Sequence, residues 1–215
     1  MPKRENISMS VIRRLPRYYR FLLQLQKSGV VRISSTELSA RLGLTASQIR
    51  QDLNCFGGFG QQGYGYMVEQ LAEAIGNILG VSNRYRTVLF GAGNLGSAIA
   101  AHMNFKDLGF DLIGIFDNAP SKVGSIIRGI AVQDTKNFPA FYAQQKPEMA
   151  VLCTPRTAAE RIVDHLYQLG IRNYWNFTHY NIAMKYPDTL VENVHLNDSL
   201  LTLCYQISNQ EGNEH

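Results

Sequence analysis

The stretch from Val88 to Gly96, VLFGAGNLG, constrains the fold of this chain more than any other. Three apolar residues run into a G-x-G-x-x-G pattern, and helix-forming residues follow at 97–101. This order is typical of the strand, turn and helix that bind a dinucleotide pyrophosphate. Gly91 is expected to adopt a turn conformation closed to residues with a Cβ, Gly93 to let the pyrophosphate approach, and Gly96 to let the helix pack closely. The predicted phosphate-binding loop comprises Gly91, Ala92, Gly93, Asn94, Leu95 and Gly96.

An acidic residue follows at the spacing that such a site needs. Asp117 ends the next apolar run, 111–116, and lies 21 positions after Gly96 (117 minus 96). A carboxylate there accepts hydrogen bonds from a ribose 2′-OH and repels a 2′-phosphate, so the pattern predicts NAD(H) rather than NADP(H). The alternative is a glycine turn with a purely structural role.

Charge is distributed unevenly along the chain. Residues 1–66 contain ten Lys and Arg against three Asp and Glu, whereas residues 67–215 contain eleven against fourteen. A net charge of +7 on the first part favours contact with a phosphate backbone and indicates two domains with different partners. The alternative is a solvated positive face without a partner.

Two short helices are predicted in the basic part. Capping boxes at 34–37 and 45–48 open them, and a turn at 42–44 joins them. Ile49 and Leu53 are expected to face inward on the second helix, which in a helix-turn-helix enters the major groove. Arginine pairs with guanine and glutamine with adenine. The predicted DNA contacts on this helix are Ser47, Gln48, Arg50 and Gln51.

Aromatic residues alternate with glycines from Phe56 to Tyr66, which predicts a tight β-hairpin. Behind a helix-turn-helix such a hairpin is a wing that reaches DNA, although a flexible loop is the alternative. Helices at 16–25 and 68–79 complete a predicted DNA-binding domain, residues 1–80. The predicted wing contacts are Phe59, Gly60, Gln61 and Tyr64.

The remainder alternates apolar runs with helical segments. Further strands are predicted at 130–132, 149–153 and 174–177, with helices around 139–145 and at 157–169. Such alternation predicts a parallel, doubly wound α/β sheet, here residues 84–192. The run at 149–153 ends at Thr154 and Pro155, where such a sheet places its ligand crevice.

The segment 200–207 is apolar on most faces, which predicts a helix that a partner chain covers. Residues 193–215 are therefore expected to form a dimerisation helix and tail. The alternative is a last helix packed on its own sheet.

Composition excludes several classes of protein. No apolar run approaches the ~20 residues needed to span a bilayer, and residues 1–6 lead into no signal-peptide core. Cys55, Cys153 and Cys204 are far apart and odd in number, which argues against a disulfide framework or a metal site. The sequence predicts a cytoplasmic protein without membrane contact.

Taken together, these motifs resemble the Rex family of redox-sensing bacterial repressors. The resemblance covers nearly the whole chain and rests on residues 14–20, 48–53, 56–57, 91–96, 116–117, 122–124, 154–156, 176–177 and 191–194. It implies an N-terminal winged helix-turn-helix, a Rossmann-type sheet and a homodimer that exchanges its C-terminal helices. It also implies binding of palindromic operator DNA with NAD⁺ or no ligand, and release when NADH binds.

The resemblance assigns individual residues by position. Arg14 and Arg17 lie in its basic motif and join the DNA contacts. The family's adenosine and cofactor-crevice residues match Asp117, Asn118, Lys122, Val123, Gly124, Thr154 and Asn176.

Four positions depart from the family pattern. Gln51 replaces a usual lysine, and Cys55 replaces a usual tyrosine. His102 stands where tyrosine is common near the nicotinamide, and His195 where aspartate is common. In the family these last two positions help to couple redox state to domain rotation, so both histidines are redox-coupling candidates. The response to NADH is then preserved, weakened or pH-dependent.

Two other functions fit parts of the pattern. An NAD-dependent dehydrogenase would need a substrate pocket and an acid–base group, for which His102 and His179 are candidates without a substrate-binding arginine cluster. The sequence therefore predicts no enzyme. A CoA- or nucleotide-binding scaffold without redox sensing is the second alternative, and an oxidation switch at Cys55 has no low-pKa context in the sequence.

Overall fold

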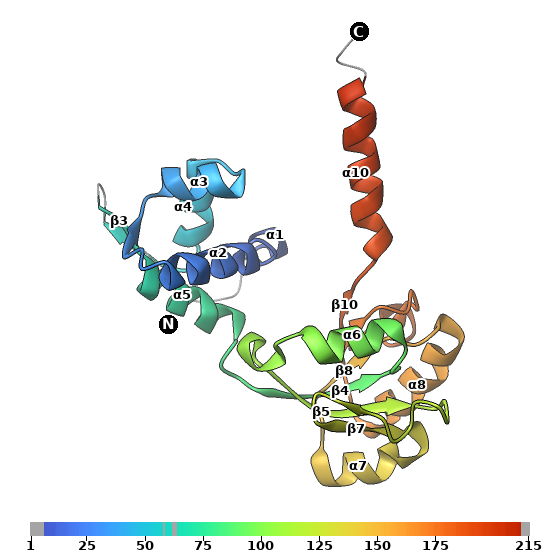
Figure 1. Cartoon of the computed structure of the whole chain (residues 1–215). Helices are drawn as coiled ribbons and strands as arrows, with labels where there is room; N and C mark the ends of the chain where they lie inside the picture. The colour runs from blue at the N-terminus through green and yellow to red at the C-terminus, as the bar shows by residue number, and fades with distance from the viewer. Residues whose placement is uncertain (1–6, 58, 62–63, 212–215) are drawn as a thin grey trace. The chain divides into compact units, whose positions relative to one another are not determined.

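The computed structural model describes residues 7–57, 59–61 and 64–211 (Figure 1). The chain forms two compact units, one up to Ser82 and one from Asn83 on. The boundary between these two units lies in the glycine-containing segment that follows the predicted helix at 68–79. The second unit includes the described part of 193–215, so a separate dimerisation segment there stays a prediction.

The first unit is a winged helix. Its three-stranded sheet has the antiparallel order β1-β3-β2. The elements are α1 (Met9–Ile12), α2 (Leu15–Lys27), β1 (Arg32–Ile33), α3 (Ser35–Leu42), α4 (Ala46–Asn54), β2 (Gly60–Gln61), β3 (Gly65–Met67) and α5 (Val68–Leu79). The predicted hairpin is confirmed where β2 pairs with β3, and residues 58, 62 and 63 of that prediction lie outside the described residues.

The helix caps explain where α3 and α4 begin. The Ser34 hydroxyl accepts a hydrogen bond from the Glu37 backbone N–H, and the Glu37 carboxylate accepts one from the Ser34 backbone N–H, so the first capping box is confirmed. At α4, the Thr45 hydroxyl accepts from the Gln48 backbone N–H at 3.1 Å. Within the described part of the chain the Gln48 side chain makes no return bond, so the second box is only half formed.

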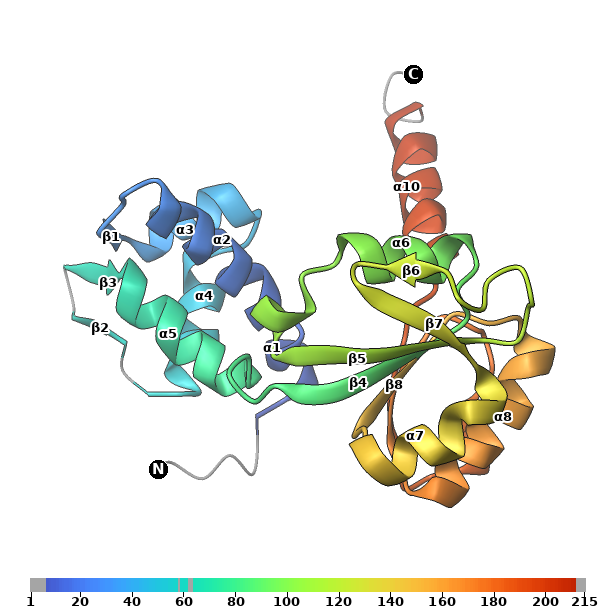
Figure 2. The ribbon, with the colours of Figure 1, turned by 60° about the horizontal axis from the view of Figure 1, so that its bottom comes forward.

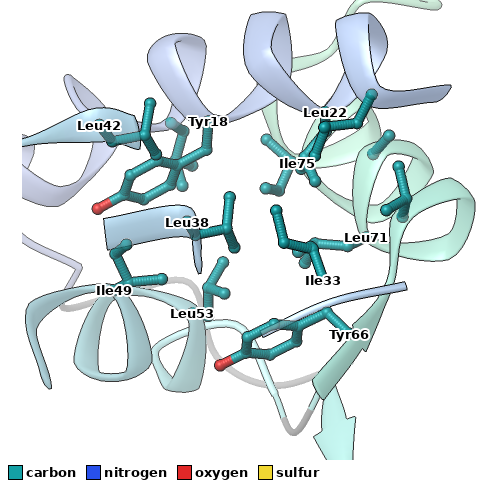
Figure 3. Close-up of a cluster of buried hydrophobic side chains, with 14 residues drawn as sticks. Tyr18, Leu22, Ile33, Leu38, Leu42, Ile49, Leu53, Tyr66, Leu71 and Ile75 are labelled. Atoms are coloured by element: carbon teal, nitrogen blue, oxygen red, sulfur yellow. The ribbon is translucent and has the colours of Figure 1, made fainter. Parts of the chain in front are cut away.

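One apolar core holds this unit together (Figure 3). Ile49 and Leu53 of α4 are 0% and 2% exposed, which confirms the inward face predicted for that helix. Burying each such side chain contributes roughly 1.5–3 kcal/mol. The labelled core side chains are Tyr18, Leu22, Ile33, Leu38, Leu42, Ile49, Leu53, Tyr66, Leu71 and Ile75.

The second unit contains a seven-stranded sheet of order β10-β9-β8-β4-β5-β7-β6. All neighbouring strands are parallel except β6, which runs antiparallel to β7, so the predicted doubly wound sheet is confirmed for the other six. The strands are β4 (Tyr85–Phe90), β5 (Phe110–Asp117), β6 (Ile126–Ile127), β7 (Ile130–Asp134), β8 (Met149–Leu152), β9 (Asn173–Asn176) and β10 (Leu190–Asn193).

Helices cover both faces of this sheet, with α6 on one face and α7 and α8 on the other (Figure 2). Strand β4 contributes side chains to the cores on both faces of the sheet, because Phe90 packs on the α7–α8 side and Leu89 on the α6 side. The helical elements are α6 (Asn94–His102), η1 (Phe105–Leu108), η2 (Thr135–Asn137), α7 (Phe138–Gln145), α8 (Arg156–Leu169), α9 (Ile182–Lys185) and α10 (Leu196–Glu211).

The last helix, α10, is not packed on its own sheet. All side chains from His195 to Gln210 are exposed. The apolar ones among them include Leu200, Leu201, Leu203, Tyr205 and Ile207. The structure therefore contradicts the alternative in which the second unit itself buries this helix. Among the described helices, none is long and apolar enough to cross a membrane.

Candidate functional site

The glycine loop between β4 and α6 has the stereochemistry that the sequence predicted. Gly91 has a φ of +98°, and a Cβ added to it would lie 2.6 Å from the carbonyl oxygen of Cys153. A Cβ on Gly96 would lie 1.8 Å from the carbonyl oxygen of Gly91, so α6 packs against the loop as only glycine allows. A Cβ on Gly93 would meet no atom of the described chain within 4 Å. The loop is therefore tight at its two ends and open in its middle.

This open position lies at the start of α6. Gly93 is the N-cap residue of the helix and has no side chain to accept from the first backbone N–H groups. Such N–H groups and the positive end of the helix dipole favour an anion. The loop thus presents space and hydrogen-bond donors at the same place.

Asp117 lies beside the loop at the end of β5. One carboxylate oxygen, Oδ2, accepts a hydrogen bond of 2.6 Å from the Ala92 N–H, and Oδ1 accepts one of 2.8 Å from the Ala119 N–H. These bonds hold the carboxylate in place and still leave each oxygen able to accept another. A sugar hydroxyl at this edge would find an oriented acceptor.

A pocket of about 310 Å³ joins these features. It brings together six of the predicted ligand-binding residues: Gly91, Gly93, Asp117, Asn118, Thr154 and Pro155. Sequence reasoning missed the other lining residues, which are Phe116, Thr135, Cys153, Ala158, Arg161 and Ile162. Residues 158, 161 and 162 lie on α8. Their spacing of three and four positions places them on one face of a helix that begins at the crevice, and this pattern in the sequence could have identified them.

Thr154 supplies a test of whether the pocket fits a polar ligand. Its hydroxyl oxygen is buried and has no hydrogen-bond partner among the described residues. A buried polar atom left without a partner costs roughly 1–3 kcal/mol, so natural proteins rarely retain one without a use. A ligand group that hydrogen-bonds this hydroxyl removes the cost. Together with the open Gly93 and the Asp117 acceptor, this arrangement fits a dinucleotide.

The pocket contains no reactive thiol. Burial raises the pKa of the Cys153 thiol to about 12, so it stays protonated at neutral pH. A thiol, unlike a thiolate, is a weak nucleophile. Cys153 is therefore not activated as a nucleophile.

Some predicted ligand residues lie outside the pocket. Lys122, Val123 and Gly124 form a turn in which the first two backbone N–H groups donate to Ala119. The remaining loop residues that do not line the pocket are Ala92, Asn94, Leu95 and Gly96. Ligand contacts from these residues stay predictions.

Asn176, a predicted ligand residue, has its side chain held by hydrogen bonds within the chain. Its side chain is 1% exposed and donates to the Tyr180 carbonyl and to the Asn193 Oδ1. Its Oδ1 accepts from both the N–H and the hydroxyl of Thr178. All four hydrogen-bonding positions of the side-chain amide are filled within the chain, and a ligand contact from Asn176 stays a prediction.

The two redox-coupling candidates have different surroundings. His102 ends α6 and is exposed. His195 precedes α10, and its Nδ1 lies 2.8 Å from the Nδ1 of His179, with the two rings stacked at 4.7 Å between centroids. No sequence pattern marks this histidine pair, because its members lie 16 positions apart.

The predicted recognition helix presents a polar face. Ser47, Arg50 and Gln51 are exposed, and Gln48 is half-buried. The Arg50 guanidinium donates to the Ser35 hydroxyl at 3.0 Å, which orients it along the start of α3. Contacts of these side chains with DNA stay predictions.

The basic residues of the first helices divide into two kinds. Arg17 is exposed on α2. Arg14 instead donates two hydrogen bonds of 2.7 Å to the buried Asp52, and Tyr18 donates a third of 2.6 Å. Burial opposes the ionisation of Asp52, but these hydrogen bonds outweigh it and hold the pKa of its carboxyl below the usual value. Arg14 is thus held by an ion pair within the domain, with its side chain 26% exposed, and a DNA contact from it stays a prediction.

The wing also divides into inner and outer residues. Phe59 is half-buried and packs against the core, and a DNA contact from it stays a prediction. Tyr64 is 68% exposed, and the guanidinium of Arg32 lies 6.0 Å from its ring centroid. Gly60 and Gln61 form β2. The outer wing surface that the structure describes is thus aromatic and basic.

Comparison with known proteins gives the same two-part division. A model described as putative DNA-binding protein N-terminus matches residues 6–54, and one described as CoA binding domain matches residues 82–180. A redox-sensing transcriptional repressor Rex from Clostridium perfringens (strain SM101 / Type A) is 48% identical over 211 residues, which cover 98% of this chain and 99% of the relative.

Solved structures also resemble nearly the whole chain. One, described as RSP in complex with beta-NAD+ and operator DNA, has a TM-score of 0.86 and 48% identity, and covers 98% of this chain and 97% of its own. The other, RSP in complex with beta-NADH, has a TM-score of 0.87 and 46% identity, with 97% of each chain covered. By this identity over its full length, the chain belongs to the Rex family of redox-sensing transcriptional repressors.

Proposed function

We propose that this chain is a DNA-binding transcriptional repressor that senses the ratio of NADH to NAD⁺. The observation that carries the proposal is the pocket in which the glycine loop, Asp117 and the partnerless Thr154 hydroxyl meet. Relatives described with NAD⁺ and operator DNA, and with NADH, support both ligands. The repressor binds operators with NAD⁺ or without ligand, and releases them when NADH binds.

The dinucleotide lies across the carboxyl edge of the sheet. Gly93 and the start of α6 receive its pyrophosphate, and Asp117 accepts from the adenosine ribose. When bound, the nicotinamide supplies the two redox states that the protein distinguishes. Thr154 and Pro155 border the part of the pocket farther along the sheet towards β8. The chain binds NADH and NAD⁺ with different consequences and does not convert one into the other, since close relatives are named as repressors and not as enzymes.

The winged helix reads the operator. Arg50 and Gln51 contact base edges or phosphates from α4, and Tyr64 with Arg32 contacts the backbone from the wing. The protein acts as a homodimer in the cytoplasm, and its two-fold symmetry requires a palindromic operator. Exchange of α10 between subunits covers the leucines at 200, 201 and 203, which the second unit leaves exposed.

The switch requires that NADH binds the arrangement unable to hold DNA more tightly than the arrangement that holds it. A ligand with equal affinity for both arrangements shifts nothing. Reciprocity then requires operator DNA to weaken NADH binding by the same factor. His102 and His195 are the candidates for transmitting the redox state.

The deciding experiment measures NADH affinity of the purified protein with and without saturating operator duplex. We expect a weaker affinity with operator, and a smaller effect on NAD⁺. Equal NADH affinities in the two conditions would remove the sensing function. A parallel operator titration at fixed NADH:NAD⁺ ratios gives the ratio at which DNA is released.

A further inference from the structure

A second cavity lies between α7 and α8, next to the dinucleotide pocket. Its volume is about 410 Å³, which is within the range of small-molecule sites. Pro139 and Ile162 line it with accessible apolar surface, above a floor of Phe90, Phe138 and Leu166 that are each no more than 2% exposed. Phe90 and Phe138 meet edge-to-face with their centroids 5.0 Å apart. This floor suits a flat aromatic ring.

The rim of the second cavity is basic. Lys136 of η2 and Arg161 and His165 of α8 are exposed along it. Arg161 and His165 are four positions apart and so share one face of α8. Among the described residues that line the cavity, none is Asp or Glu. An apolar floor beneath a cationic rim favours a ligand with a ring at one end and an anionic group at the other.

The second cavity shares a wall with the dinucleotide pocket. Thr135, Arg161 and Ile162 line both. A ligand in one space therefore contacts side chains that a ligand in the other also contacts. Because a ligand in one space can move side chains that the other ligand also contacts, this shared wall provides a physical route by which the two sites can affect each other.

We propose that the second cavity binds a small aromatic carboxylate, and that this binding changes the affinity of the neighbouring pocket for its dinucleotide. The ring lies against Pro139 and Ile162, above the floor of Phe90, Phe138 and Leu166. The carboxylate lies between Lys136, Arg161 and His165, with Arg161 able to offer it two parallel N–H donors. The repressor then responds to the concentration of an organic acid as well as to the redox state.

The first test uses phenylacetate as the probe and its uncharged amide, phenylacetamide, as the matched control ligand. Calorimetric titration of the full-length protein is expected to show phenylacetate binding that is at least about tenfold tighter than phenylacetamide binding. The double variant Lys136→Glu/His165→Glu changes two exposed residues that line only the second cavity. It should lose phenylacetate affinity at least about tenfold and keep NADH affinity within about twofold.

Lys106→Glu is the control variant, since Lys106 is an exposed cation on η1 away from the second cavity. It should bind phenylacetate as the wild type does. Absence of phenylacetate binding to the wild type would overturn the proposal. So would equal binding of acid and amide, or unchanged binding by the double variant.

The second test measures NADH affinity at increasing phenylacetate concentration. Coupling between two sites predicts a shift in the NADH Kd that levels off once the second cavity is full. A shift that keeps growing in proportion to the acid would place phenylacetate in the dinucleotide pocket and overturn the second site. No shift would overturn the coupling. Neither result alters the operator test of the proposed function, so the two failures are distinguishable.

Discussion

Arg14 and Asp52 lie 38 positions apart and form a bidentate ion pair at 2.7 Å that ties the recognition helix α4 to the segment before α2. The Asp52 side chain is 4% exposed, whereas that of Arg14 is 26% exposed. Tyr18 completes the arrangement by donating to the same carboxylate. The position of α4 therefore depends on a partly buried ion pair.

Replacing Arg14 with Ala is expected to destabilise the protein by about 3 kcal/mol. The change leaves a buried carboxylate without its cation, which costs more than the pair contributes when intact. Urea unfolding measures the difference. The control is Arg17→Ala, an exposed neighbour whose removal should change the free energy of unfolding by less than about 0.5 kcal/mol. Equal stability of the two variants would show that the pair carries no structural role.

Asp52 also predicts how stability depends on pH. Its pKa is lower in the folded than in the unfolded protein, whose value is near 3.8. The carboxylate therefore stabilises the fold above that value, and the stabilisation is lost as pH falls through the folded pKa. Urea unfolding from about pH 6 to about pH 3 should show a steeper loss in the wild type than in Asp52→Asn. The other acids with lowered pKa values are present in both proteins, so parallel curves would contradict the prediction.

Arg50→Ala is expected to weaken operator binding by about 1–3 kcal/mol, since Arg50 lies exposed on α4 where a base-reading arginine belongs. Fluorescence anisotropy with a labelled operator measures the affinity. Lys27→Ala, at the far end of α2, is the matched loss of one positive charge. Equal losses in the two variants would mean that Arg50 contributes charge alone.

Gly93→Val and Gly96→Val separate ligand binding from folding. A Cβ on Gly93 meets no described atom within 4 Å, so this variant should fold and bind operator but fail to release it with NADH. A Cβ on Gly96 overlaps the Gly91 carbonyl oxygen, so this variant should not fold stably. Circular dichroism and operator release measure the two effects. Normal NADH release by Gly93→Val would show that the pyrophosphate lies elsewhere.

Thr154→Val removes a hydroxyl that has no partner among the described residues. Without ligand, the variant should be as stable as the wild type or more stable by about 1 kcal/mol, because a buried unsatisfied group is lost. Its NADH affinity should fall roughly fivefold to tenfold, since a ligand hydrogen bond is lost with it. Thermal unfolding and NADH titration measure the two. A large loss of stability without ligand would assign the hydroxyl a structural role instead.

Local stereochemistry let the sequence determine the loop, the caps and the order of the elements. Gly91 and Gly96 are required by a positive φ and a close approach, and both follow from a strand that turns directly into a helix. The Ser34 capping box is equally local, since both partners lie within one turn. Motifs whose residues lie within a few positions of one another therefore suffice to predict the glycine loop and the helix cap.

Only the tertiary structure decided which distant side chains meet. Asp52 contacts Arg14, His195 contacts His179, and Asn176 donates to Asn193. No periodicity in the sequence marks any of these three contacts. Strand β6 has two residues and pairs at the sheet edge, so it gives no alternation to detect. Arg161 lines two cavities, because the packing of α8 on the sheet places its side chain there. The residues next to Arg161 in the sequence do not determine this position. Contacts of this kind depend on how whole elements pack, and that free energy is distributed over the entire core.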